Sequence, residues 1–209
     1  MAAIKQKELE RILNSLERLK SPSPALEQYF TPPSLAASIV YDAAMRGDVI
    51  GRRIADLGCG VGTFAIASMI MGAASAAGFD VDEKSVQTAA RNALRSLPAE
   101  KLAMTSFETM GVDEVKGQFD TVFQNPPFGS QRKNADLPFL NKALEISDTA
   151  YTIHLRRTQS FIEDKVRELG GRVDFEKSFT YEMPWMFRFH DRRSMKFELI
   201  LFKVVKIQN

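Results

Sequence analysis

The chain has 209 residues, of which 44% are hydrophobic and 26% are charged, and its net charge at pH 7 is +2. This length and composition are typical of one globular α/β domain that can bury a large core. A net charge this close to zero excludes a strongly basic or acidic protein, so any surface that attracts nucleic acid must be local.

Cellular location is addressed by three features of the sequence. Cys59 is the single cysteine, which excludes an internal disulfide framework and suits a reducing compartment. The N-terminus has no apolar segment of the signal-peptide kind, and no apolar run reaches about 18 residues. We therefore expect a cytoplasmic protein with neither a leader nor a membrane span, and a nuclear location is the alternative.

Short apolar runs alternate with segments of helical periodicity, which predicts a parallel sheet with crossover helices. Residues 1–46 are predicted to form a helical extension, with helices over 4–20 and 33–45 and with Thr31 as the cap of the second. The predicted strands cover 53–57, 74–79, 102–105, 119–123, 149–155, 172–183 and 195–207. Further helices are predicted over 63–71, 83–95, 137–146 and 159–169.

This order of elements predicts an α/β fold with a Rossmann-like, seven-stranded, doubly wound sheet. Helices are expected on both faces, because they alternate with the strands. The last two predicted strands are adjacent in sequence and alternate in polarity, which is typical of a hairpin with an antiparallel last strand. The whole chain, 1–209, is expected to form a single domain.

A glycine loop follows the first predicted strand, where residues 56–62 read Asp-Leu-Gly-Cys-Gly-Val-Gly. Glycines at 58, 60 and 62 let the backbone approach a ligand closely, and their spacing differs from the G-x-G-x-x-G of dinucleotide sites. The shorter loop suits a nucleoside ligand with a methionine tail, whose ammonium Asp56 would meet. Asp80 ends the next strand, where an acidic group accepts ribose hydroxyls. The alternative is a tight turn with Asp56 as a helix cap.

The fourth predicted strand ends in Asn125-Pro126-Pro127-Phe128-Gly129. The two prolines fix a rigid turn and remove two donors, so the Asn125 side chain and the Pro126 carbonyl are available as acceptors. Two acceptors that converge on one amino group would orient its lone pair and stabilise the positive charge that grows during methyl transfer. Phe128 offers a face on which a planar base can stack. The alternative is a turn that merely ends the sheet.

These segments resemble the methyltransferase-like protein 5 family, whose members are adenosine-N6 methyltransferases of small-subunit ribosomal RNA, and its archaeal relatives. The resemblance covers about residue 26 to the end and depends on residues 27–31, 56–60, 78–82 and 125–129, with further matches at Asp136, 139–140, Tyr151 and His154. It implies a class I methyltransferase sheet, S-adenosylmethionine as the cofactor, and RNA, in particular ribosomal RNA, as the substrate.

The resemblance also implies roles for individual residues. Gln28, Tyr29 and Thr31 would line the cofactor pocket, and Ser106 stands where the family often has an acidic residue near the cofactor's adenine. The implied cofactor-binding set is Gln28, Tyr29, Thr31, Asp56, Gly58, Gly60, Asp80, Ser106 and Asn125. The residues expected to hold the acceptor are Asn125, Pro126, Pro127 and Phe128.

Two kinds of partner are expected, RNA and a protein. Basic residues cluster at 132–133, 154–157 and 188–193, beside aromatic residues that suit a splayed-out base, although each cluster is equally consistent with a solvated turn. His154 and His190 are possible RNA contacts or ordinary residues at strand ends. The family resemblance implies a small zinc-binding activator protein that adds a strand to a sheet edge. The small residues at 73–79 fit such an edge, or tight helix packing.

Other interpretations of the same residues stay open at this point. The acceptor turn also suits a protein glutamine amide or guanine N2, because both present an amino group on an sp2 carbon. A cofactor-binding scaffold without catalysis is a third possibility. Cys59 is interpreted as a small packing residue, since no histidine lies near it in sequence. The two histidines and one cysteine show no metal-ligand spacing, so no metal site is predicted.

Overall fold

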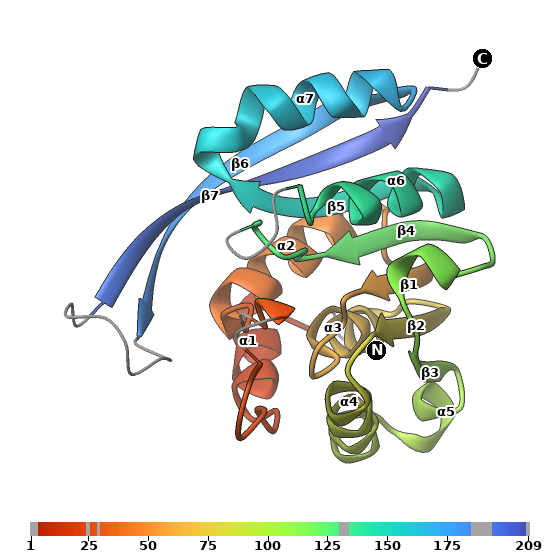
Figure 1. Ribbon diagram of the computed structural model, residues 1–209. Helices are drawn as coiled ribbons and strands as arrows, with labels where there is room; N and C mark the ends of the chain where they lie inside the picture. The colour runs from red at the N-terminus through yellow and green to blue at the C-terminus, as the bar shows by residue number, and fades with distance from the viewer. Residues whose placement is uncertain (1–3, 24–25, 29, 130–133, 185–193, 208–209) are drawn as a thin grey trace.

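The computed structural model describes residues 4–23, 26–28, 30–129, 134–184 and 194–207, which build a seven-stranded sheet between layers of helices (Figure 1). The strands are β1 (Arg53–Leu57), β2 (Ser75–Asp80), β3 (Thr105–Thr109), β4 (Phe119–Gln124), β5 (Ser147–Leu155), β6 (Gly171–Pro184) and β7 (Ser194–Lys206). The helices are α1 (Gln6–Asn14), α2 (Pro33–Met45), α3 (Thr63–Met71), α4 (Glu83–Ser96), α5 (Ala99–Leu102), α6 (Leu137–Ile146) and α7 (Gln159–Glu168). Two 3₁₀ turns, η2 (Val112–Glu114) and η3 (Arg156–Thr158), complete the described elements.

The strand order is β3-β2-β1-β4-β5-β7-β6, and the first five strands of this order are parallel. β7 runs antiparallel between β5 and β6, as predicted. The crossovers from β1 and from β4 leave toward opposite ends of the sheet, so the order reverses between these two neighbours. A crevice therefore opens at their carboxyl ends, which is where ligands bind in open α/β sheets.

Alternate residues of each strand face the two helical layers. Ile54 of β1 packs in the main core with α1, α2 and α3, whereas its neighbour Ala55 packs on the other side with α6. The end of β7 follows the same rule, because Leu201 belongs to the main core and Phe202 to the cluster under α6 and α7. Burial of both faces explains why consecutive apolar residues occur inside the central strands, as at Ile54-Ala55 and Val122-Phe123.

The N-terminal helix is shorter than predicted, since α1 ends at Asn14 and not near residue 20. The Ser15 hydroxyl donates to the carbonyl of Ile12 (2.7 Å), a local bond that competes with a further helical turn. Beyond it, Asn92 of α4 binds the backbone of Glu17 at both its N–H (2.8 Å) and its carbonyl (3.0 Å). The segment after α1 is thus held as an extended strap against α4.

Three further expectations are wrong. The third strand covers Thr105–Thr109 and not 102–105, because the preceding residues form α5. Thr31 does not cap α2, whose N-cap is Pro32. The small residues of β2 do not form a sheet edge, since β2 pairs with β1 on one side and with β3 on the other.

β6 and β7 form a long hairpin that extends past the rest of the sheet (Figure 1). Their pairing continues to Pro184 opposite Ser194, whereas the pairing of β5 with β7 ends at Leu155 opposite Leu199. The two predicted strands at 172–183 and 195–207 are therefore confirmed. By length and hydropathy, none of the helices in the described ranges could cross a bilayer.

Candidate active site

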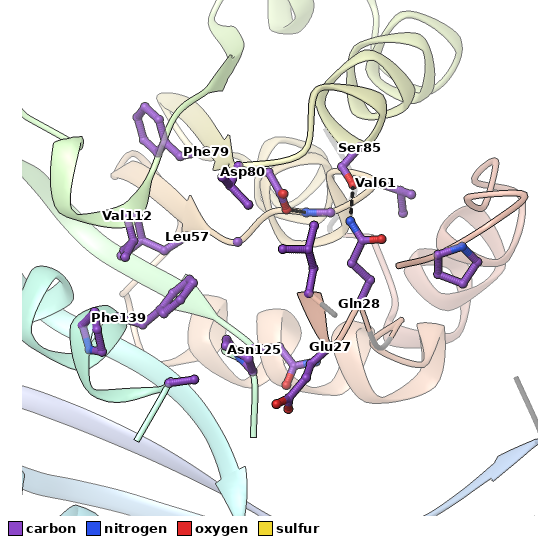
Figure 2. Close-up of a pocket in the computed structure, with 18 of the residues that line it drawn as sticks. Glu27, Gln28, Leu57, Val61, Phe79, Asp80, Ser85, Val112, Asn125 and Phe139 are labelled. Atoms are coloured by element: carbon purple, nitrogen blue, oxygen red, sulfur yellow. Dashed lines mark hydrogen bonds between the residues drawn. The ribbon is translucent and has the colours of Figure 1, made fainter. Parts of the chain in front are cut away.

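A cavity of about 600 Å³ lies at the carboxyl ends of β1, β2 and β4 (Figure 2). The strap between α1 and α2 covers one side of this cavity, and the start of α6 forms another wall. The lining includes Gln28, Gly58, Gly60, Asp80, Asp113, Asn125, Pro127, Asn134, Ala135, Pro138 and Phe139. The cavity occupies the crevice that the reversal of strand order predicts.

The glycine loop curves beneath the cavity because three of its residues have a left-handed backbone. Gly58, Gly60 and Gly62 have φ values of 67°, 53° and 85°. A Cβ on Gly58 would lie 3.1 Å from the ring of Phe139, and one on Gly62 would lie 3.0 Å from Phe107. Side chains at these two positions would be strained in backbone and crowded in space, which explains the pattern of glycines.

Asp80 ends β2 and lines the cavity, as predicted for the residue that would meet ribose hydroxyls. One carboxylate oxygen accepts the N–H of Gly60 (2.8 Å) and the other accepts the N–H of Asp82 (2.9 Å). The first bond fixes the glycine loop to the neighbouring strand, as Figure 2 shows. Burial raises the pKa of Asp80.

Asp56 does not line the cavity. Its side chain is 1% exposed and accepts the N–H of Ala65 (2.9 Å), so it caps the first turn of α3. Burial raises the pKa of this carboxyl to about 7. Of the two interpretations of Asp56, the structure places the side chain in the position of a cap. Neighbouring Cys59 is also buried, and burial raises the pKa of its thiol, which fits a packing role.

Gln28 of the strap lines the cavity and joins it to the loop after β2. Its amide nitrogen donates to Asp82 (3.1 Å) and to the hydroxyl of Ser85 (3.3 Å; Figure 2). Its amide oxygen accepts the N–H of Ser23 (2.6 Å). Gln28 therefore closes the strap over the cofactor side of the cavity. Tyr29, the neighbouring residue of the implied set, lies outside the described residues.

Asn125 lies on the opposite side of the cavity from Asp80 in Figure 2. Its amide nitrogen donates to the hydroxyl of Thr31 (3.0 Å), which fixes the orientation of the amide. The amide oxygen is buried and has no hydrogen-bond partner among the described residues. Thr31 itself does not line the cavity, so it contributes through Asn125. This pairing was not predicted, because the two residues are 94 positions apart.

Of the other residues in the acceptor turn, 126–128, one lines the cavity and two do not. Pro127 lines the cavity, whereas Pro126 is buried and is not part of the lining. Phe128 is partly buried and packs against the main core. It is not part of the cavity wall, where the ring nearest the glycine loop belongs to Phe139.

Ser106 is placed away from the cavity. It lies inside β3, paired with Ala77, and not after the strand. The cavity is lined instead by Met110, Val112 and Asp113, which follow the true end of β3. Asp113 is thus the acidic residue near the position where the resemblance implies one. An acidic residue after the third strand was therefore present in the sequence. It was not identified, because the third strand was predicted to end at residue 105 and not at Thr109.

The predicted basic clusters are only partly described. Arg156 and Arg157 are exposed at the end of β5, and Arg156 donates to the hydroxyl of Ser178. His154 is 1% exposed and therefore cannot be a surface RNA contact, which corrects one expectation. The clusters at 132–133 and 188–193, including His190, lie outside the described residues. Within the described residues, no group of three or more histidine, cysteine or acidic side chains could hold a metal ion.

Comparison with known proteins decides the family. The family model of the methyltransferase small domain matches residues 38–148, more than half of the chain. The rRNA N(6)-adenosine-methyltransferase Mettl5 of Drosophila melanogaster is 32% identical over 95% of this chain and 95% of its own length. The chain belongs to the Mettl5 family of methyltransferases. The resemblance noted in the sequence is therefore confirmed.

Solved structures agree with this assignment to the Mettl5 family. A proposed RNA methyltransferase from Pyrococcus horikoshii, PH1948, is 34% identical and superimposes with a TM-score of 0.89, over 98% of this chain and 99% of that one. Magnesium protoporphyrin IX methyltransferase from Synechocystis, solved with S-adenosylmethionine bound, is 17% identical with a TM-score of 0.66, over 99% of this chain and all of that one. The second likeness shows the fold alone. The predicted class I methyltransferase fold is confirmed.

Proposed function

We propose that this enzyme transfers a methyl group from S-adenosylmethionine to the exocyclic N6 of an adenosine in RNA, in particular in small-subunit ribosomal RNA. The observation that carries the proposal is the amide oxygen of Asn125, a buried acceptor at the cavity without a partner in the described part of the chain. A buried acceptor of this kind costs free energy until a donor arrives. An amino group on a planar base is such a donor, and membership of the Mettl5 family favours adenosine in rRNA.

Several groups on one side of the cavity support S-adenosylmethionine as the ligand there. Asp80 offers carboxylate oxygens for ribose hydroxyls, and Gly58 and Gly60 leave room for the backbone to approach the methionine tail. Gln28 closes the strap over this side. Asp113 lines the same cavity after β3, in a place suited to the adenine amino group. When bound, the cofactor would supply an electrophilic methyl group.

The amino group of the acceptor base would donate to the amide oxygen of Asn125, which turns the nitrogen lone pair toward the methyl group. The same oxygen would stabilise the positive charge that develops on nitrogen as the bond forms. The Pro126 carbonyl is the second acceptor that the sequence predicts, and this residue lies beside the cavity lining and not in it. No general base is needed, because the methylated amino group would be cationic and acidic enough to release its proton to water. Most of the acceleration would then come from alignment of the reacting atoms.

Phe128 is assigned to stacking on the base from outside the cavity. It follows the two prolines directly, so a base whose amino group reaches Asn125 would lie beside this turn. Its ring is partly buried against the main core, which would give the stacking face a rigid backing. A base within an RNA helix would have to be flipped out to reach this position. Exposed Arg156 and Arg157 after β5 could neutralise nearby phosphates.

A small zinc-binding activator is proposed as a protein partner. Its binding site is proposed at β3, because β2 lies inside the sheet. β3 is the terminal strand of the sheet on the cofactor side, where another strand can pair. Exposed apolar residues lie near this strand, Met104 immediately before it and Leu94 on α4, which packs on β3. We also propose a cytoplasmic location for the protein, and this proposal is based only on its amino-acid composition.

The test is transfer of radiolabelled methyl from S-adenosylmethionine to total ribosomal RNA, followed by identification of the labelled nucleoside by mass. The proposal expects label in N6-methyladenosine, and none with the Asn125→Ala protein. Label in N2-methylguanosine, or in a protein fraction as methylglutamine, would replace adenosine by one of the alternative acceptors. Absence of label with and without an added activator would favour a scaffold and contradict the proposal.

A further inference from the structure

Four polar side chains form a continuous hydrogen-bonded row behind the acceptor wall of the cavity. The Gln124 amide donates to the Thr152 hydroxyl (2.9 Å), and this hydroxyl lies 2.8 Å from Nε2 of His154. Nδ1 of the same histidine lies 3.1 Å from a carboxylate oxygen of Asp136. Gln124, Thr152 and His154 are fully or almost fully buried, and the Asp136 side chain is 13% exposed. We name these four residues the polar row.

The donors and acceptors of the polar row assign its hydrogen positions. The Asp136 carboxylate can only accept, so His154 Nδ1 carries the ring proton and donates it to Asp136. In the neutral imidazole, Nε2 then accepts the hydroxyl proton of Thr152, whose oxygen accepts from Gln124. Each bond in the row therefore has one donor and one acceptor, and the imidazole is fixed at both nitrogens. A side chain held this firmly is suited to positioning another element.

Asp136 departs from the ordinary use of an aspartate at its position. It is the N-cap residue of α6, where an aspartate side chain usually accepts an N–H from the first turn of its own helix. Here its side chain makes no capping hydrogen bond and turns instead to His154 on β5. The first turn of α6 therefore lacks a side-chain cap from Asp136. The same side chain attaches the start of the helix to β5.

The element attached in this way forms part of the cavity wall. Asn134, Ala135, Pro138 and Phe139 surround Asp136 in sequence and line the cavity. Asn134 has a left-handed backbone (φ 61°), which marks a sharp turn directly before the helix. At the other end of the row, Gln124 immediately precedes Asn125. The polar row thus joins the two walls of the cavity that face the acceptor.

We propose that Asp136 and His154 are positioning residues that hold the start of α6 at a fixed separation from Asn125, and so define the slot that admits the acceptor base. This inference rests on the proposed function, because it concerns the acceptor of that same reaction. The pair acts through position and not as a proton relay. The row ends at the amide of Gln124, which does not ionise, and His154 is too buried to meet RNA.

The test compares Asp136→Ala with Asp136→Asn in the full-length chain. The asparagine variant keeps an oxygen that can accept from His154 Nδ1, and the alanine variant does not. We expect Asp136→Ala to lower kcat/KM for RNA by about 10- to 100-fold, the range for a misplaced reacting group, with the dissociation constant of S-adenosylmethionine within about twofold. Asp136→Asn should retain most of the wild-type value.

A second matched pair approaches the same bond from the histidine. The amide of His154→Asn can occupy the place of Nδ1 and still donate to Asp136, whereas His154→Gln reaches the place of Nε2 and keeps only Thr152. The asparagine variant should therefore be the more active of the two. The opposite order would overturn the assignment of the Asp136 bond as the one that matters.

Hydrogen exchange supplies a readout that does not depend on activity. In Asp136→Ala, amides over 134–140 should exchange about tenfold faster, as expected for loss of one hydrogen bond to a charged group, while α3 and α4 keep the wild-type rates. Unchanged exchange over 134–140 would overturn the inference even if wild-type protein fails to methylate RNA. Methylation by wild type with equal kcat/KM in Asp136→Ala would overturn it too. An equal loss of cofactor affinity in Asp136→Ala would contradict the inference, because Asp136 would then support the whole cavity and not the acceptor slot.

Discussion

The two sides of the cavity differ in how their polar groups are satisfied. On the cofactor side, Asp80 is bound by backbone N–H groups of the glycine loop and of its own loop, and Gln28 is bound at both ends of its amide. On the acceptor side, the Asn125 amide is bound only through its nitrogen, and its oxygen has no partner within the described ranges. On the cofactor side, Asp80 and Gln28 are thus already hydrogen-bonded within the protein, whereas on the acceptor side the buried amide oxygen of Asn125 has no partner in the described residues.

This difference has an energetic meaning. An unsatisfied buried acceptor costs about 1–3 kcal/mol, and a ligand that donates to it recovers this amount. Because Thr31 holds the amide in place, no reorganisation is required when the donor arrives. Under the proposed function, the two sides would have separate tasks. The cofactor side would supply affinity through groups that are already ordered, and the acceptor side would discriminate for an amino group.

The largest effect is expected from Asn125→Ala. This change removes the buried amide oxygen that would accept from the amino group. We therefore expect kcat to fall about 100-fold or more, as for loss of one preorganised transition-state contact. The measurement is single-turnover methyl transfer to RNA at saturating cofactor. Asn125→Asp is the matched control, because it keeps an acceptor oxygen but cannot donate to Thr31, and it should retain more activity than the alanine variant. Equal losses in the two variants would show that the oxygen is not the functional atom.

Asp80→Asn should affect the other side of the cavity. It replaces a carboxylate that can accept from ribose hydroxyls, and loss of charge-assisted hydrogen bonds should raise the dissociation constant of S-adenosylmethionine about 10- to 100-fold. Isothermal titration calorimetry checks this. At saturating cofactor, kcat should stay within a few-fold of wild type. A large loss of kcat with unchanged affinity would reverse the roles of the two sides.

Asp56 should make stability depend on pH. Burial raises the pKa of this carboxyl from 3.8 to about 7, so in this window the folded chain keeps a proton that the unfolded chain has released. The free energy of unfolding should therefore fall as pH rises through the window. Asp56→Asn cannot ionise and can still accept from Ala65. Relative to this variant, wild type should lose about 2 kcal/mol between about pH 5 and pH 8 in urea titrations. A pH-independent difference would contradict the buried position of Asp56.

The smallest effect is expected from Gln28→Ala, which frees the strap from Asp82 and Ser85. The loss of about 1 kcal/mol of partly exposed hydrogen bonding, one bond to a carboxylate and one to a hydroxyl, predicts cofactor affinity about fivefold weaker, measured by calorimetry. Gln87→Ala is the control, because Gln87 lies on α4 and bonds only to exposed Glu83 in the described contacts. It should leave affinity unchanged. Equal effects of the two changes on affinity would show that the strap does not contribute to cofactor binding.

The sequence predicted the sheet well because most of its elements carry their own local signals. α3 and α6 were predicted to the residue, since each has a clear start and a punctuated end. The third strand was misplaced by about three residues because 99–102 lack periodicity over so short a span, and α5 occupies them. That single error moved the expected adenine contact from the region of Asp113 to Ser106. The N-terminal helix was predicted too long, because the bonds from Asn92 that hold Glu17 in the strap are long-range.

The site was predictable where a residue acts through its own strand end and unpredictable where it acts through a distant partner. Gly58, Gly60, Asp80 and Asn125 follow strands, and parallel strands bring their carboxyl ends together. By contrast, the pairing of Thr31 with Asn125 and that of Asp136 with His154 join segments whose separation in sequence gives no local pattern. Asp56 was ambiguous, since one carboxylate before a glycine loop can cap a helix or face a ligand.

The central claim is that affinity for the cofactor and turnover reside on opposite sides of one cavity. The most direct test is the dissociation constant of S-adenosylmethionine for Asn125→Ala, measured by calorimetry on the same preparation used for kinetics. We expect a dissociation constant within about twofold of wild type, together with the loss of about 100-fold in kcat. A loss of cofactor affinity comparable to the loss of turnover would contradict it, because Asn125 would then belong to the cofactor side.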